Sequence, residues 1–150
     1  MPRVERGAHV SWDGNLARGV GLISGKTGAF ADLPYSLPTR IGAPDGKTSP
    51  EELLAAAHAG CLAMSLAGEL TAAGTPPERI DVDATIRLDE RPGRGHLIVA
   101  SNVEIRGRVS GLTANAWEQA VELADRGCTF STLLRDAGAE VQVNARLEEA

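Results

Sequence analysis

Two cysteines, Cys61 and Cys128, are the residues of this chain best suited to nucleophilic or redox chemistry. A thiolate is a strong nucleophile, and two thiols that meet in a folded chain can be oxidised to a disulfide. They are far apart in the sequence, so neither belongs to a CxxC motif or to a zinc knuckle. A buried cysteine is more often a small hydrophobic side chain, so packing is the competing interpretation for both.

Cys61 lies in the middle of a predicted helix, within the segment TSPEELLAAAHAGCLAMSL (residues 48–66). Ser49, Pro50 and Glu52 have the spacing of a capping box with proline at the first helical position. The helix is expected to continue for about 24 residues, until the segment GTPP ends it. The dipole of this helix fades after its first turn, so a cation from elsewhere must stabilise a thiolate at Cys61.

Arg40 is the candidate cation, because it precedes the helix and carries a permanent charge on a planar donor group. Beside Cys61 it could stabilise the thiolate and hold a peroxide oxygen; the alternative is a solvated loop charge. Glu51 is not used by the capping box and could orient Arg40. Glu51 lies about 15 Å from Cys61 along the helix, so it could act only through Arg40 or from a partner subunit.

His58 and Cys128 complete the set of candidate residues. His58 stands one turn before Cys61, and a Cys–His pair would suit a thiol hydrolase. The sequence shows no third orienting residue, and we expect His58 to be packed.

Cys128 follows Gly127 and begins a new helical segment, where a thiol tends towards a lower pKa. In a peroxidase, the Cys61 thiolate would become a sulfenic acid and Cys128 would condense with it.

The remaining elements predict an α+β fold with an antiparallel sheet and a single domain over residues 1–150. A β-rich N-terminal third contains a hairpin turn at residues 25–28. Beyond the long helix we expect strands at 79–88 and 96–109, a helix at 113–126, a short helical segment at 129–138 and a strand at 139–147. The long helix is apolar on most sides, so a second copy of the chain could cover the face that one sheet leaves open.

Composition excludes several classes of function. The chain has 150 residues, 43% of them apolar, and a net charge of −5, which argues against nucleic acid as a partner. No early segment resembles a signal peptide, and no stretch approaches 18 apolar residues without a charge, so we expect no membrane span and a cytoplasmic location. The histidines, at positions 9, 58 and 96, are scattered without the spacing of metal ligands.

Four segments together resemble the OsmC/Ohr family of organic hydroperoxide reductases, and its OsmC branch more closely. They are SWDGNLARGVG, PYSLPTRIG, TSPEELLAAAHAGCLAMSL and ADRGCTFSTLLRDAGAEVQVNARL, and they span nearly the whole chain in order. The resemblance implies an intertwined homodimer in which antiparallel sheets wrap around long buried central helices, with two active sites at the interface. It also implies that no metal or haem is needed.

The resemblance matches the reactive cysteine of the family to Cys61, the resolving cysteine to Cys128, and the paired arginine and glutamate to Arg40 and Glu51. It implies reduction of organic hydroperoxides, with hydrogen peroxide reduced less well, and regeneration by a small dithiol such as dihydrolipoamide. The family often has proline directly after the second cysteine, where this chain has Thr129.

The sequence therefore predicts a thiol-dependent peroxidase that acts on organic hydroperoxides. Its substrate walls would come from apolar residues, namely Leu54, Ala57, Met64 and Phe130. A thiol hydrolase that uses His58 and a non-catalytic binding or structural module with packed cysteines are the two alternatives.

Overall fold

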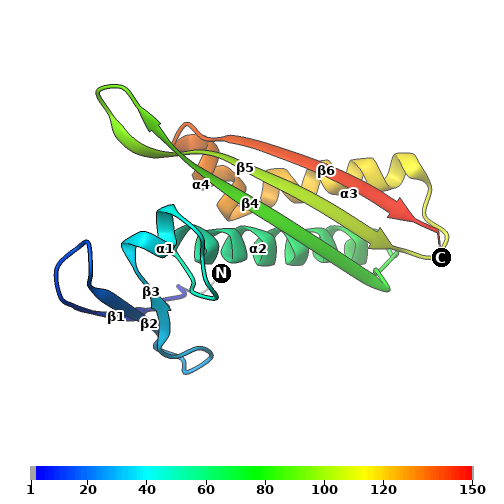
Figure 1. Cartoon of the computed structure of the whole chain (residues 1–150). Coiled ribbons are helices and arrows are strands. Elements are labelled where there is room, and N and C mark those ends of the chain that lie inside the picture. Colours follow the sequence, from blue (N-terminus) through cyan, green and yellow to red (C-terminus); the bar gives the residue numbers. More distant parts are fainter. Residues whose placement is uncertain (1–2, 150) are drawn as a thin grey trace. The chain divides into compact units, whose positions relative to one another are not determined.

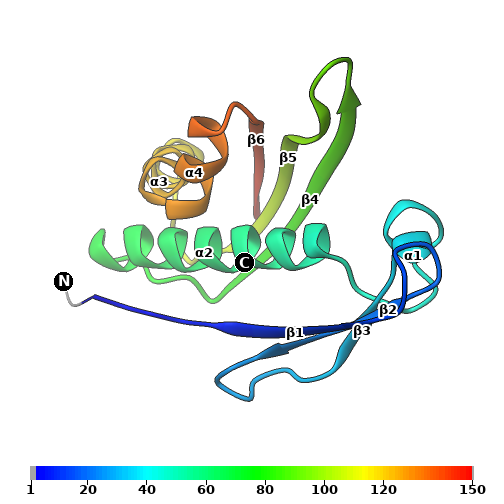
Figure 2. The same ribbon diagram turned by 90° about the vertical axis from the view of Figure 1, so that its left-hand side faces the viewer.

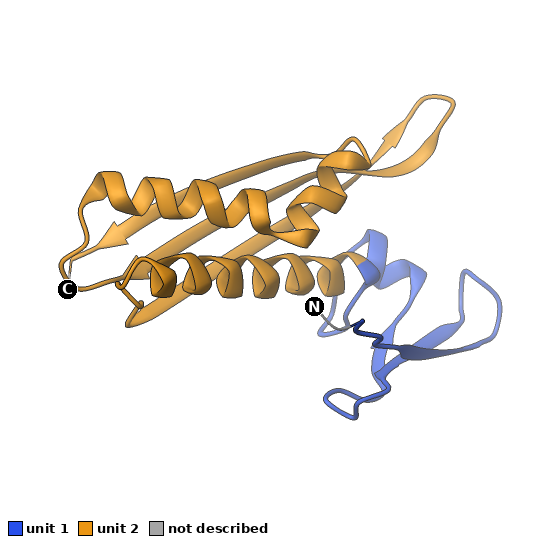
Figure 3. Cartoon of the chain, turned by 180° about the vertical axis from the view of Figure 1, so that it is seen from behind, with its two compact units in different colours: residues 1–50 blue, residues 51–150 orange. Residues whose placement is uncertain are grey.

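The computed structural model describes residues 3–149, and the chain divides into two compact units, Met1–Pro50 and Glu51–Ala150 (Figure 3). The elements, in chain order, are β1 (Ala8–Asp13), β2 (Val20–Gly25), β3 (Leu33–Tyr35), α1 (Leu37–Ile41), α2 (Pro50–Ala72), β4 (Arg79–Arg91), β5 (Gly95–Arg108), α3 (Ala114–Gly127), α4 (Thr129–Asp136) and β6 (Glu140–Glu148) (Figure 1). This order confirms the α+β class. The prediction of a single domain over 1–150 stays a prediction.

The first unit is an antiparallel sheet in the order β1-β2-β3, followed by the short helix α1. The predicted turn between β2 and β3 is present: the Gly28 N–H donates to the Gly25 carbonyl at 3.0 Å, and Gly28 has φ +83°, which glycine adopts without strain. Helix α1 was not predicted. Its five residues are too few to show helical periodicity, although Ser36 caps it by accepting a bond from the Thr39 N–H.

The second unit begins with α2, whose bounds agree with the prediction to within about one residue. Gly74, at φ +80°, follows the helix, and the Thr75 N–H returns to the Leu70 carbonyl at 2.9 Å. A glycine in the left-handed region just after the last turn is a common helix end, because it satisfies carbonyls that have no helical donor.

Strands β4 and β5 form the predicted antiparallel hairpin, with a register shift between Arg87 and Leu88. The expectation of an antiparallel sheet does not hold for β6, which pairs with β5 in parallel. The reason is the connection: β5 leads through α3 and α4, and a crossover of this kind returns the chain in the same direction. The second sheet, in the order β4-β5-β6, is therefore mixed.

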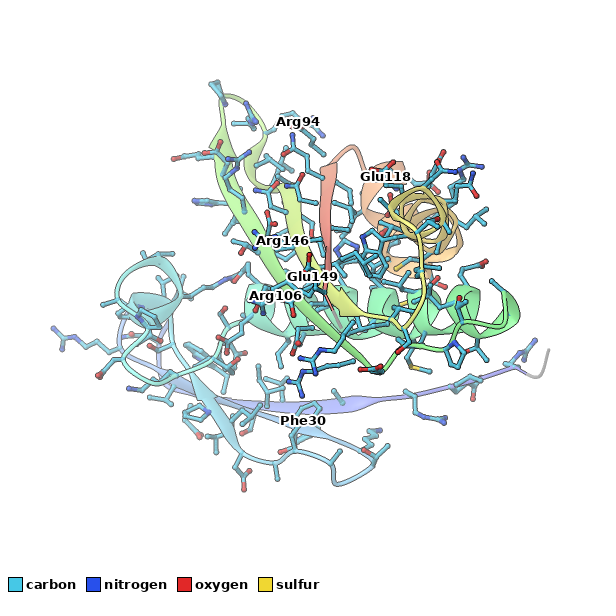
Figure 4. All side chains as sticks on the ribbon, turned by 90° about the vertical axis from the view of Figure 1, so that its right-hand side faces the viewer. Phe30, Arg94, Arg106, Glu118, Arg146 and Glu149 are labelled. Atoms are coloured by element: carbon cyan, nitrogen blue, oxygen red, sulfur yellow. The ribbon has the colours of Figure 1, made fainter. Side chains whose placement is uncertain are left out.

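One face of the second sheet is charged and the other is apolar. Along β5, exposed charged positions alternate with buried ones, as expected for a strand with one wet face. Arg106 donates to Asp83 on β4 at 3.1 Å, and Arg146 is its register partner on β6 (Figure 4). An exposed ion pair such as Arg106–Asp83 stabilises a fold by less than about 1 kcal/mol. We therefore assign the main stabilisation of the second unit to the apolar face of the sheet.

The apolar face of the sheet carries α2, α3 and α4 (Figure 2). The core that they form contains, from α2, Leu62, Leu66 and Leu70; from β5 and the segment after it, Val103, Ile105 and Val109; and, from α3 and the residue after it, Trp117, Ala120, Val121, Ala124 and Cys128. Gly107 allows the Trp117 ring to lie against β5, since a Cβ atom there would come within 2.2 Å of the indole. These contacts place the middle of α2 beside the junction of α3 and α4.

Helix α2 is also long and apolar enough, by length and composition, to cross a membrane. This differs from the expectation that no segment qualifies, because Glu51, Glu52 and Glu69 lie near its ends and leave a long uncharged middle. The core helix of a soluble protein passes the same test. One face of α2 packs in the core of its own unit, whereas Met64 on another face is 78% exposed in the single chain.

Candidate active site

Cys61 and Cys128 come together inside the second unit. Cys128 is fully buried, Cys61 is partly buried, and both are free thiols. The two side chains are within hydrogen-bond reach of each other, and Cys61 packs against the core cluster that contains Cys128. Two neighbouring thiols are the arrangement that a disulfide between them requires.

Cys128 is held by the tight junction between α3 and α4. It is both the C-cap of α3 and the N-cap of α4, with φ −75° and ψ 117°. Its N–H donates to the Asp125 carbonyl at 3.2 Å, and its carbonyl accepts from the Thr132 N–H at 3.1 Å. Both predicted helical segments are confirmed, and Thr113 caps α3 as expected by accepting a bond from the Ala116 N–H.

The start of α4 faces Cys61. Burial and the hydrogen bond to Cys128 raise the pKa of the Cys61 thiol above its ordinary value, while the backbone N–H groups of Phe130 and Thr129 oppose this rise by donating to its sulfur. From sequence we had expected the helix start to act on Cys128, but its N–H donors reach Cys61 instead. Within this unit the surroundings of Cys61 favour the neutral thiol, and a nearby positive charge would favour the thiolate.

His58 is fully buried and bonded on both sides of its ring. Its Nδ1 lies 2.7 Å from the Ser101 Oγ on β5, and its Nε2 lies 2.7 Å from the Ser131 Oγ on α4. Both ring nitrogens are thus engaged, which leaves no lone pair to accept a proton from Cys61 and speaks against a Cys–His hydrolase. The two serines were missed from sequence, because a serine far along the chain gives no local signal of its partner.

Burial lowers the pKa of His58 below its ordinary value; Arg135 adds to this effect and Asp125 opposes it. A neutral imidazole has one N–H donor and one acceptor, and a serine hydroxyl can serve either. His58 therefore joins α2, β5 and α4 as an uncharged link, in agreement with the expectation that it is packed.

Arg40 lies in the last turn of α1 in the first unit, where it borders a cavity of about 320 Å³. The walls are mostly apolar and come from Trp12, Leu16, Tyr35, Ser36 and Leu37. Trp12 and Tyr35 meet edge to face, with ring centroids 5.6 Å apart. Glu51 lies in the first turn of α2. Arg40 and Cys61 belong to different compact units, so the pairing of Arg40 with Cys61 and with Glu51 stays a prediction.

Within residues 3–149, no group of three or more histidine, cysteine or acidic side chains is placed to hold a metal ion.

The lowered pKa of His58 makes the stability of the fold depend on pH. In the unfolded chain His58 takes up a proton below about pH 6.5, whereas the folded chain resists it. The stabilisation is therefore complete above that pH and is lost as the pH falls, by at most about 1.4 kcal/mol per pH unit for one proton. Urea unfolding at pH 7 and pH 5 should show a smaller loss for His58→Gln than for the unchanged chain. His96→Gln, at an exposed position, is the control and should keep the full loss. An unchanged loss in His58→Gln would contradict this account.

Comparisons with known proteins agree on one family. The family described as OsmC-like protein matches residues 43–144, which is more than half of the chain. Peroxiredoxin OsmC of Escherichia coli (strain K12) is 32% identical over 145 residues, covering 97% of this chain and 98% of that protein.

Solved structures show the same fold. An organic hydroperoxide resistance protein of Elizabethkingia anophelis is 21% identical with a TM-score of 0.75, and covers 98% of this chain and 99% of its own. An organic hydroperoxide resistance protein OsmC of Legionella pneumophila is 21% identical with a TM-score of 0.70, and covers 97% of this chain and 99% of its own. The chain belongs to the family of OsmC-like proteins.

Proposed function

We propose that this protein is a thiol-dependent peroxidase that reduces organic hydroperoxides through Cys61 and Cys128. The contact between these two side chains carries the proposal, because a reactive thiol and a resolving thiol must meet to form a disulfide. The relative named peroxiredoxin OsmC supports a cysteine-based peroxidase.

The reaction has two steps at the protein. The Cys61 thiolate attacks one oxygen of the hydroperoxide, the O–O bond breaks, and the departing alkoxide takes a proton to become an alcohol. Cys61 is then a sulfenic acid. The Cys128 thiol condenses with it, which forms the S–S bond and releases water. An external dithiol, of the kind that dihydrolipoamide represents, exchanges with this disulfide, restores both thiols and is itself oxidised to a disulfide.

Arg40 supplies the positive charge that Cys61 lacks within its own unit. A guanidinium keeps its charge at any working pH, and near a buried thiol it favours the thiolate. Glu51 orients that guanidinium, within one chain or across two. The need for such a cation follows from the raised pKa of Cys61, since a thiol attacks peroxide only when it is ionised.

The substrate class follows from the apolar surroundings of Cys61. Phe130 packs with Cys61 against the core cluster, and Leu54 and Ala57 lie on α2 in the turns before Cys61. Apolar walls favour an alkyl or fatty-acid hydroperoxide over hydrogen peroxide, because burying the alkyl group stabilises the complex. Free cysteines fit a reducing compartment, so the cytoplasm is the proposed location.

A second copy of the chain is the proposed cover for α2. The apolar side chain of Met64 on α2 is 78% exposed in the single chain. An exposed apolar face on a long helix is typical of a protein–protein interface. An intertwined homodimer would bury this face and bring residues of two chains to each active site.

One equivalent of cumene hydroperoxide should remove both free thiols and leave an intramolecular disulfide. In Cys128→Ser the same treatment should stop at a sulfenic acid on Cys61, which dimedone traps, whereas Cys61→Ser should keep its Cys128 thiol. Thiol counting and mass spectrometry measure all three. Hydrogen peroxide should react more slowly than cumene hydroperoxide. Equal rates would contradict the apolar substrate class, and retention of both thiols would favour packed cysteines.

Arg40→Met should raise the pKa of Cys61 further, because the cation that favours its thiolate is gone. An opposite charge within about 4–6 Å shifts a pKa by about 1–3 units, so the reaction with peroxide at pH 7 should slow by about 10- to 1000-fold. Arg40→Lys should retain part of the rate. Arg18→Met removes an exposed arginine of the same unit and is the matched control. An Arg40→Met chain that reacts as fast as the control would exclude Arg40 from the site.

Sedimentation should give twice the 15.7 kDa mass of one chain. Met64→Arg places a charge on the exposed face of α2 and should shift the protein to the mass of one chain, because an unpaired buried charge is unfavourable. Leu123→Arg, at a 49% exposed position on α3, is the control and should leave the mass unchanged. A wild-type protein with the mass of one chain at all concentrations is the result that excludes the dimer.

A further inference from the structure

Two hydrogen bonds hold α2 against the stretch of chain in which α3 ends and α4 begins. On the α4 side, the Nε2 of His58 lies 2.7 Å from the Oγ of Ser131, and both side chains are fully buried. On the α3 side, the hydroxyl of Ser65 donates to the carbonyl of Ala124 at 2.7 Å. Ser65 also lies beside the end of α3, since a Cβ atom on Gly127 would come within 3.6 Å of its Oγ. Both bonds therefore join α2 to the same junction.

The two cysteines lie between these bonds. His58 and Ser65 stand three residues before and four residues after Cys61, a spacing that puts all three on one face of α2. Their partners stand three residues after and four residues before Cys128. The two segments thus run past each other in opposite directions, and the two bonds by themselves set Cys61 opposite Cys128. The packing of Cys61 against the core cluster that contains Cys128 agrees with this register.

We propose that these two hydrogen bonds position Cys128 for its condensation with the sulfenic acid of Cys61. The inference rests on the proposed function and adds positioning residues to it: His58 and Ser131 on one side of the thiol pair, and Ser65 on the other. They act by fixing how α4 is rotated and how far the junction lies from α2, because a buried polar atom that loses its partner is unfavourable.

The resolving step needs such positioning because it competes with a second oxidation. In the condensation, the Cys128 sulfur attacks the sulfenic sulfur of Cys61, the S–S bond forms, and the hydroxyl group leaves with the Cys128 proton as water. In the competing reaction, a second hydroperoxide transfers one oxygen atom to the sulfenic acid, which gives a sulfinic acid and an alcohol. A dithiol does not reverse this second oxidation. The outcome depends on how often Cys128 lies within reach of the sulfenic sulfur.

Three serine-to-alanine variants separate positioning from general stability. Ser131→Ala and Ser65→Ala each remove one of the two bonds beside the thiol pair. Ser101→Ala is the matched control, because it removes the other bond of the same His58 ring. That bond is also 2.7 Å long and fully buried, but it leads to β5 and leaves the link between α2 and α4 in place. In urea unfolding, Ser101→Ala should lower the free energy of unfolding by about as much as Ser131→Ala.

The test follows the two steps at the protein separately. Each reduced variant is mixed with cumene hydroperoxide and quenched in acid at successive times, and mass spectrometry counts the states of each cysteine. Loss of the Cys61 thiol, which reports the first step, should occur at the wild-type rate in all three variants. Formation of the disulfide should be about two- to tenfold slower in Ser131→Ala and in Ser65→Ala, the effect expected from one lost hydrogen bond. With excess hydroperoxide, both should accumulate correspondingly more sulfinic acid on Cys61, whereas Ser101→Ala should match the wild type.

Wild-type rates of disulfide formation in both Ser131→Ala and Ser65→Ala overturn the inference. An equal slowing in Ser101→Ala also overturns it, because the effect would then follow the stability of the fold and not the position of Cys128. Where circular dichroism shows that Ser131→Ala does not fold, Ser65→Ala decides the outcome alone, since its side chain is only partly buried.

Oxidation by diamide separates this inference from the peroxidase proposal. One thiol adds to the N=N bond of diamide, and the second thiol then displaces the adduct, which forms the disulfide and releases the reduced hydrazine. No peroxide is involved, so the same two variants should again form the disulfide more slowly than the control. A wild type whose thiols survive cumene hydroperoxide ends the peroxidase proposal, while the diamide rates still test the positioning. Equal rates in every variant, with a wild type that does reduce hydroperoxide, overturn the positioning alone.

Discussion

The contact between the Cys61 and Cys128 side chains is the interaction on which the rest of the site depends. It exists because α3 ends and α4 begins at one residue, so that a single position serves as cap for both helices. A longer connection would give the second thiol more freedom and make its meeting with Cys61 rarer. Small side chains, among them Ala120 and Ala124 of α3, are part of the core that α2 shares with this junction, and Cys61 packs against that core.

Burial has two opposite effects on this pair. It excludes water and brings the sulfur atoms together, yet it also favours the neutral thiol, as the raised pKa of Cys61 shows. The donors at the start of α4 oppose that effect from within the second unit without introducing a charge. Arg40, on the mostly apolar cavity of the first unit, is the residue that we propose as the source of a full positive charge.

The buried hydrogen bonds of His58 fix the orientation of α4 relative to α2 and β5. His58, Ser101 and Ser131 are each fully buried, and each ring nitrogen of the histidine has a hydroxyl partner at 2.7 Å. A satisfied polar group of this kind adds specificity to an apolar core, because any other rotation of α4 would leave a ring nitrogen without a partner. The hydroxyl of Ser65 has a similar role further along α2, since it donates to the Ala124 carbonyl of α3 at 2.7 Å.

The sequence by itself determined the elements and the pair of thiols. Local signals can be recognised in a sequence without knowledge of the fold. Examples are the proline at position 50, the alternation along residues 79–88 and the cap at Thr113. Cys61 and Cys128 stand out because the chain has no other cysteine, and the family resemblance implies distinct roles for them. Helix α1 was not predicted, because its five residues are too few to show helical periodicity in the sequence.

Only the tertiary structure decided what surrounds each group. It placed β6 parallel to β5, gave His58 two serine partners from distant segments, and turned the start of α4 towards Cys61 instead of leaving its effect on Cys128. None of these follows from spacing along the chain, because hydrogen bonds, burial and helix-end fields depend on which distant segments pack together.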